Sequence, residues 1–97
     1  MVLAERMLEM VRSVPAGRVV SYGDIAAAAG SPSARLAGTV LSALADDSVP
    51  WHRVVKADGR FAAHLADTQT ALLRAEGVWV EDGRVVPLTR FRHRFDG

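Results

Sequence analysis

The sequence predicts a small α+β domain of the winged helix-turn-helix class. Three observations favour this class: two short helices separated by a Gly-Ser-Pro break at residues 30–32, a β-hairpin pattern at residues 78–86, and a length of 97 residues, which suits one domain. The apolar fraction of 49% is enough for a hydrophobic core, so we expect residues 1–97 to form a single domain.

The N-terminal part predicts a helix and a short strand. Apolar residues recur at helical spacing through residues 3–14. Pro15, Ala16 and Gly17 end that helix, because Pro disfavours helical geometry before it and Gly permits a turn. Residues 18–20 then form a short β-like segment.

Residues 21–44 predict the helix-turn-helix. Ser21 has the position of an N-cap, Asp24 completes a capping box, and Gly30 ends the first helix. Ser31 predicts the next N-cap and Pro32 the first position of a helix that continues to residue 44. We expect an apolar stripe of this second helix to face the core, formed by Leu36, Val40, Ala43 and Leu44.

The second half of the chain predicts short elements between turns. In order, these are a polar loop at residues 46–48, a strand at 53–55, a turn at 58–59, a helix at 68–76 ended by Gly77, and a hairpin of residues 78–80 and 84–86 around Asp82 and Gly83. The tail at residues 90–95 alternates Arg with aromatic or imidazole rings. It could follow a nucleic-acid backbone, but we favour a closing strand with Phe91 and Phe95 packed inward.

Composition excludes several classes of function. The chain has no Cys, which removes disulfides, thiolate catalysis and Cys-type zinc sites. Three scattered His residues lack ligand spacing, so we expect neither a metal nor a cofactor. Acidic residues come early and no apolar run has membrane length, so we expect a cytoplasmic monomer without membrane contact. The net charge of +1 neither favours nor excludes nucleic acid.

One face of the second helix is nearly bare of side chains. Arg35, Gly38 and Ser42 share that face, so a DNA backbone could approach it while Arg35 reaches a groove or a gap in the base stack. Alternatively, Gly38 permits tight helix packing and Arg35 is solvated. Tyr22 follows the N-cap Ser21, where free N–H groups favour a phosphate; alternatively its ring simply covers the helix start.

Trp51 and His52 form a second candidate group. His52 could act as a general base, but we favour a hydrogen-bonded structural role because no side chain nearby in sequence needs activation. Trp51 could fill the core or line a pocket that receives an extruded base.

Three ordered segments together resemble the O6-alkylguanine-DNA alkyltransferases. They are residues 14–26, with Ser21-Tyr22-Gly23; Ala34-Arg35-Leu36-Ala37-Gly38; and Pro50-Trp51-His52-Arg53-Val54-Val55, with Glu76-Gly77 further on. That family transfers an alkyl group from guanine to a Cys at the position of Trp51. An indole is not a nucleophile, so the chain is similar to the alkyltransferase-like subfamily, which binds O6-alkylguanine without removing the alkyl group.

The resemblance implies roles for particular residues. Tyr22 would rotate the damaged nucleotide out of the duplex, and Arg35 would fill the gap. Other DNA contacts would come from Ser33, Ala34 and Gly38, and the lesion pocket from Pro50, Trp51, His64 and Tyr22. His52 and Glu76 match the relay that activates the thiol, here without one. The family's Asn hinge has no counterpart at residues 45–48, and residues 61–66 replace its Gly-rich loop.

The expected function is therefore a non-enzymatic sensor. Its partners would be double-stranded DNA containing O6-alkylguanine and nucleotide excision repair proteins. An alternative is a winged-helix transcriptional regulator, although the exposed helix face lacks the Asn, Gln and Arg array typical of base readout. The third interpretation is an enzyme that uses water with His52 as base.

Overall fold

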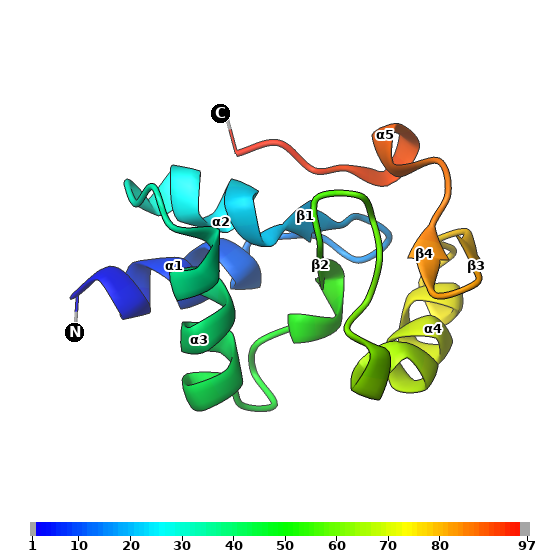
Figure 1. Ribbon diagram of the computed structural model, residues 1–97, viewed down its shortest axis with the longest axis horizontal. Coiled ribbons are helices and arrows are strands. Elements are labelled where there is room, and N and C mark those ends of the chain that lie inside the picture. Colours follow the sequence, from blue (N-terminus) through cyan, green and yellow to red (C-terminus); the bar gives the residue numbers. More distant parts are fainter. Residues whose placement is uncertain (1, 96–97) are drawn as a thin grey trace.

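The computed structural model describes residues 2–95 as two groups of helices joined by short strands (Figure 1). The N-terminal group holds α1 (Val2–Arg12), α2 (Tyr22–Ala29) and α3 (Ala34–Leu44), with β1 (Val20–Ser21) before α2. The rest comprises η1 (Trp51–Arg53), β2 (Val54–Val55), η2 (Ala63–Leu65), α4 (Ala66–Ala75), β3 (Val80–Glu81), β4 (Arg84–Val85) and α5 (Leu88–Phe91). Within residues 2–95, no helix has the length and apolar character needed to cross a bilayer.

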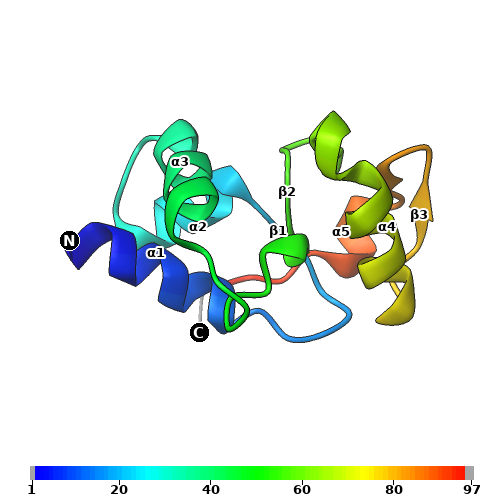
Figure 2. The same ribbon diagram turned by 90° about the horizontal axis from the view of Figure 1, so that it is seen from below.

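Two hydrophobic clusters form the core, one on each side of the paired strands. Figure 2 shows α1, α2 and α3 on one side, α4 with β3 on the other, and β1 and β2 between them. The two strands are parallel, with Val20 opposite Val54 and Ser21 opposite Val55. Val20 and Val54 belong to the helical cluster, whereas Val19 and Val55 belong to the cluster around α4. Alternation of side chains along residues 19–20 and 54–55 therefore connects both halves of the core.

The predicted caps and turns around α2 and the hairpin are confirmed. The Ser21 hydroxyl accepts the Asp24 N–H at 3.0 Å, the Asp24 carboxylate accepts the Ser21 N–H at 3.1 Å, and Gly30 ends α2 with φ of 84°. Asp82 and Gly83 have φ of 50° and 71°, the pair of positive values that a tight two-residue hairpin turn requires.

The predicted start of α3 is wrong, and its predicted buried face is right for Val40 and Leu36 but wrong for Ala43 and Leu44. Ser33, not Ser31, is the N-cap: its hydroxyl accepts the Leu36 N–H at 3.1 Å, while the Ser31 hydroxyl accepts the Ser33 N–H. Pro32 therefore precedes the helix. The buried residues of α3 are Ala37, Val40 and Leu41. The predicted stripe ran too far toward the C-terminus of the helix, where Leu44 is 53% exposed.

The predicted strand at 53–55 is shorter in the structure, and the tail is not a closing strand, although Phe91 is buried and Phe95 packs against the core as predicted. Trp51–Arg53 is a 3₁₀ turn, and only Val54–Val55 is a strand. The tail begins as helix α5, because burial of Phe91 and partial burial of Leu88 follow helical spacing against the core. Arg92 then leaves the helix, bridges to Val19 and pairs with Asp24.

Gln69 on α4 holds the segment that carries Trp51. It is 1% exposed, and its amide nitrogen donates to the carbonyl oxygens of His52 at 3.1 Å and Val54 at 3.0 Å. Each bond satisfies a backbone acceptor that would otherwise lie beside the core. The predicted helix start at residue 68 was close, since α4 begins at Ala66, but the sequence pattern did not indicate this task for Gln69.

Glu76, the C-cap of α4, joins three separate segments. Its carboxylate accepts from Arg53 Nε at 3.0 Å and Arg53 Nη2 at 2.8 Å, and from the Gly17 N–H at 3.1 Å. His52 Nε2 lies 2.7 Å from it and must carry the hydrogen, because an ionised carboxylate only accepts. Arg53 also donates to the Val14 carbonyl at 2.9 Å, which ties the end of α1 to the same network.

The network determines the ionisation of Glu76. Burial by itself raises the pKa of this carboxyl, but hydrogen bonds from Arg53, His52 and the Gly17 N–H outweigh burial and lower the pKa from 4.5 to about 2. The folded state therefore holds Glu76 as an anion across the physiological range. A paired anion with its acceptor sites filled makes a rigid joint between α4, η1 and the loop after α1.

We expect Gln69→Leu to lower the free energy of unfolding by about 1–3 kcal/mol, because the His52 and Val54 carbonyls lose their donor while the volume is kept. Urea denaturation followed by circular dichroism measures this loss. Thr68→Leu, at an exposed neighbouring position on α4, is the control and should change stability by less than about 0.5 kcal/mol. Equal stability of the Gln69 variant and the wild type would contradict the assigned role.

Glu76 should make stability depend on pH. Since its pKa falls on folding, its contribution is complete above the unfolded value of 4.5 and disappears as the pH drops toward 2. The shift corresponds to at most about 3 kcal/mol. Urea titrations from pH 7 to pH 2 should show a smaller acid loss in Glu76→Gln than in the wild type, together with lower stability at pH 7. Glu5→Gln, at an exposed site on α1, should retain the wild-type slope; parallel curves for wild type and Glu76→Gln would refute the idea.

Candidate nucleic-acid interface

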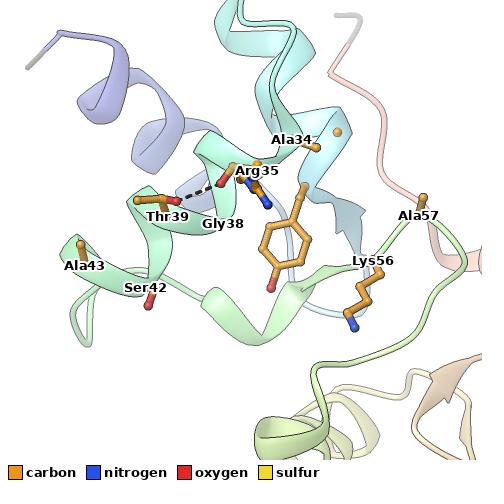
Figure 3. Close-up of a pocket in the computed structure, with 10 residues that line it drawn as sticks. Ala34, Arg35, Gly38, Thr39, Ser42, Ala43, Lys56 and Ala57 are labelled. Carbon is orange, nitrogen blue, oxygen red and sulfur yellow. Dashed lines mark hydrogen bonds between the residues drawn. The ribbon is translucent and has the colours of Figure 1, made fainter.

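The exposed face of α3 forms one wall of an open groove of about 730 Å³, which we call the α3 groove. As predicted, Arg35, Gly38 and Ser42 lie together on that face. Figure 3 shows them across from Lys56 and Ala57, which follow strand β2. The remaining lining residues are small or aromatic: Tyr22, Gly23, Ala34, Thr39 and Ala43. Small side chains therefore line most of the groove, with Arg35 on the α3 side and Lys56 on the opposite side.

Tyr22 connects the groove to the interior. It is the first residue of α2, directly after the N-cap Ser21, and its ring lies over Gly38. A Cβ atom added at Gly38 would sit 3.9 Å from two carbons of that ring, so Gly38 sets how closely α3 and the ring approach. Burial raises the pKa of Tyr22, and the phenol therefore keeps its proton at neutral pH as a hydrogen-bond donor.

A second hollow of about 410 Å³, the Trp51 pocket, adjoins the groove. Tyr22, Gly38 and Ser42 line both. Trp51 and His64 come from η1 and η2 on the side away from α3, and the other walls are mostly apolar: Leu41, Ala45, Ala62 and Leu65. The arrangement places an aromatic wall and an apolar chamber directly behind Tyr22, large enough for a purine-sized group.

The structure separates other predicted site residues from this surface. Pro50 lines a different hollow, together with His52 and Arg53, while Trp51 borders both that hollow and the Trp51 pocket. Pro50 therefore positions Trp51 rather than lining the predicted lesion pocket. Ser33 is the N-cap of α3 and lies outside the groove lining, whereas Ala34 lies within it.

His52 is held by Glu76 and lies outside the Trp51 pocket. Its ring is held by Glu76 and forms an edge contact with Trp51, with the ring centroids 6.1 Å apart. The side chain is only 14% exposed and lines the hollow on the Pro50 side, not the Trp51 pocket. Among residues 2–95, no three His, Asp or Glu side chains gather as a possible metal site.

Sequence reasoning missed Lys56 as a groove residue. Its only signal was chemical: it is the single Lys in a chain whose other fixed cations are Arg. Its place opposite α3 depends on the parallel pairing of β1 and β2, which brings the end of β2 beside the start of α2. No local pattern indicates that pairing.

Comparisons with known proteins agree with this geometry. A model of the 6-O-methylguanine DNA methyltransferase DNA-binding domain matches residues 3–78. The DNA base-flipping protein of Escherichia coli K12 is 40% identical over 95 residues, which cover 94% of this chain and 74% of that protein. Alkyltransferase-like protein 1 of Schizosaccharomyces pombe is 39% identical over 56 residues, or 56% of this chain and 52% of that protein.

The fold agrees as well. The structure of S. pombe Atl1 in complex with damaged DNA containing O6-carboxymethylguanine superposes with a TM-score of 0.86 at 27% identity, covering 95% of this chain and 94% of that one. The predicted α+β winged helix-turn-helix class is thereby confirmed. The chain belongs to the family of the 6-O-methylguanine DNA methyltransferase DNA-binding domain and is similar to its alkyltransferase-like members.

Proposed function

We propose that this protein is a non-enzymatic sensor of O6-alkylguanine in DNA, which rotates the damaged nucleotide out of the duplex and marks it for nucleotide excision repair. One observation carries the proposal: Tyr22, Gly38 and Ser42 line both the α3 groove and the Trp51 pocket. A duplex seated on α3 would therefore have a chamber for an extruded base directly beside it.

Chemistry supports binding without transfer. An alkyl group leaves guanine O6 by attack of a thiolate, and this chain has no Cys. Trp51 has a carbon and nitrogen ring system that does not attack an alkyl group at neutral pH. Its flat face instead offers an apolar contact to the alkyl group and the purine. Recognition would then be reversible.

Tyr22 and Arg35 supply the means of extrusion. The neutral phenol of Tyr22, beside the free N–H groups at the start of α2, would contact a phosphate and press on the backbone. Arg35, exposed at the first turn of α3, would enter the vacated space and stack on the neighbouring bases. Flipping costs a few kcal/mol and less for a weakened pair, so alkylation at O6 itself contributes selectivity.

The transfer of the site to excision repair rests on the resemblance to alkyltransferase-like proteins. A reversible binder that leaves the lesion in place needs a partner to remove it. Nucleotide excision repair is the route that the resemblance implies.

Two other functions fit the geometry less well. A sequence-reading regulator would need the long Asn, Gln and Arg side chains typical of base readout along α3, but beside Arg35 the exposed face carries only short side chains: Ala34, Gly38, Thr39, Ser42 and Ala43. A hydrolase would need its base beside the extruded lesion, whereas His52 lines the hollow on the Pro50 side and is held by Glu76.

Titration with duplexes tests the function directly. We expect tighter binding to a duplex with one O6-methylguanine than to the same duplex with guanine, because the weakened pair opens at lower cost. With a tritiated methyl group, denatured protein should carry no label after prolonged incubation, and the DNA should release neither methanol nor free guanine. Equal affinity for both duplexes would refute a lesion sensor, and labelled protein or released product would refute a non-enzymatic one.

Arg35→Ala should weaken binding to the O6-methylguanine duplex by about 1–3 kcal/mol, the scale of one lost stacking contact. Fluorescence anisotropy at constant salt measures the change. Arg6→Ala is the matched control: Arg6 lies on α1, which packs against the buried side of α3, and it is absent from the groove lining. Unchanged lesion affinity in Arg35→Ala would remove this side chain from the mechanism.

A further inference from the structure

Lys56 is the second cationic side chain that lines the α3 groove, and the proposed function gives it no role. It follows β2 directly and stands on the wall opposite α3, so that Figure 3 shows it across the groove from Ser42 and Gly38. The two fixed cations that line the groove, Lys56 and Arg35, therefore come from different elements and flank the same space.

The backbone of Lys56 is held in place. Its N–H donates to the Arg60 carbonyl at 2.9 Å, and its own carbonyl accepts the Gly59 N–H at 2.8 Å. Gly59 is buried with φ of 86°, and a Cβ atom there would meet the Val85 carbonyl at 3.0 Å. The turn is thus closed tightly against the hairpin, and the position of Lys56 relative to the groove is constrained.

The charge of Lys56, in contrast, is available. The side chain is exposed, and among residues 2–95 no carboxylate pairs with its ammonium group. Asp58, the nearest acid in sequence, pairs with Arg60 at 3.2 Å instead. An unpaired ammonium on a constrained turn, facing a groove of small side chains, is complementary to a phosphate.

We propose that Lys56 binds a backbone phosphate of the extruded nucleotide, from the wall opposite α3. This inference rests on the proposed function and adds to it a contact made only after rotation. Arg35 suits the gap in the stack because its guanidinium is planar, whereas the compact ammonium of Lys56 suits a phosphate. Tyr22 lines both the α3 groove and the Trp51 pocket, so a nucleotide whose base enters the pocket past Tyr22 would keep its phosphates in the groove, which Lys56 also lines.

Such a contact by Lys56 should affect affinity for a duplex that contains the lesion differently from affinity for an undamaged duplex. A contact made only in the flipped state strengthens binding to O6-alkylguanine and leaves binding to an intact duplex nearly unchanged. A contact to ordinary duplex phosphates would strengthen both equally. The number of phosphates neutralised on the lesion duplex can be read from the dependence of affinity on salt.

The test compares wild type, Lys56→Gln, Lys56→Arg and Arg6→Gln on duplexes with guanine or O6-methylguanine, each at several salt concentrations. Lys56→Gln should bind the lesion duplex roughly 5- to 10-fold more weakly, with a log–log salt slope smaller by about 1, and change affinity for the plain duplex by less than about 2-fold. Lys56→Arg should stay near wild type, because the charge is kept. Arg6→Gln removes one positive charge from α1 and should leave discrimination intact.

The outcomes separate the inference from the function on which it rests. Lesion-duplex affinity that stays at the wild-type value in Lys56→Gln overturns the inference alone. Equal weakening on both duplexes also overturns it and makes Lys56 an ordinary duplex contact. Failure of the wild type to discriminate overturns the proposed function and the inference together. Circular dichroism of Lys56→Gln verifies the fold.

Discussion

The proposed recognition surface depends on the hydrogen bonds by which α4 holds the turn that carries Trp51. Gln69 satisfies the backbone carbonyls of His52 and Val54, and Glu76 takes the side chains of His52 and Arg53. These bonds hold residues 52–54, directly after Trp51, against α4 from two positions, two turns apart on the helix. The indole therefore stands at the border of its pocket on a braced segment, and an aromatic wall must be braced to discriminate by shape.

The same bonds give His52 and Glu76 a structural role in this chain. The resemblance places His52 and Glu76 where the alkyltransferases activate a thiol, and this chain has no thiol. Here the pair has a structural function that is independent of proton transfer: with Gly17 and Arg53 it joins the loop after α1 to α4. Removal of Glu76 would leave the largely buried Arg53 guanidinium without its carboxylate. The need to join these segments is thus sufficient to explain why His52 and Glu76 are paired.

The α3 groove, which Tyr22 also lines, combines small side chains with two cations. In the proposed function, small residues on α3 would let a duplex approach, and the two flanking cations come from elements that the strand pairing brings together. Arg35 and Lys56 differ in shape, and that difference fits two different targets, a gap between bases and a phosphate. Tyr22 stands where the groove meets the Trp51 pocket, so in the proposed function one ring would separate contact with the duplex from contact with the extruded base.

The sequence by itself determined the local features: the Ser21 capping box, the Gly30 helix end, the Asp82-Gly83 turn and the shared face of Arg35, Gly38 and Ser42. Each depends on residues within a few positions of one another, where side-chain and backbone preferences act directly. Tertiary structure decided the rest. Gln69, Glu76 and Lys56 have their contacts or their place in the groove only because segments distant in the chain lie beside them. The choice of Ser33 over Ser31 as N-cap and the exposure of Leu44 depend on where the core ends. Contacts between segments far apart in the chain leave no local pattern by which to predict them.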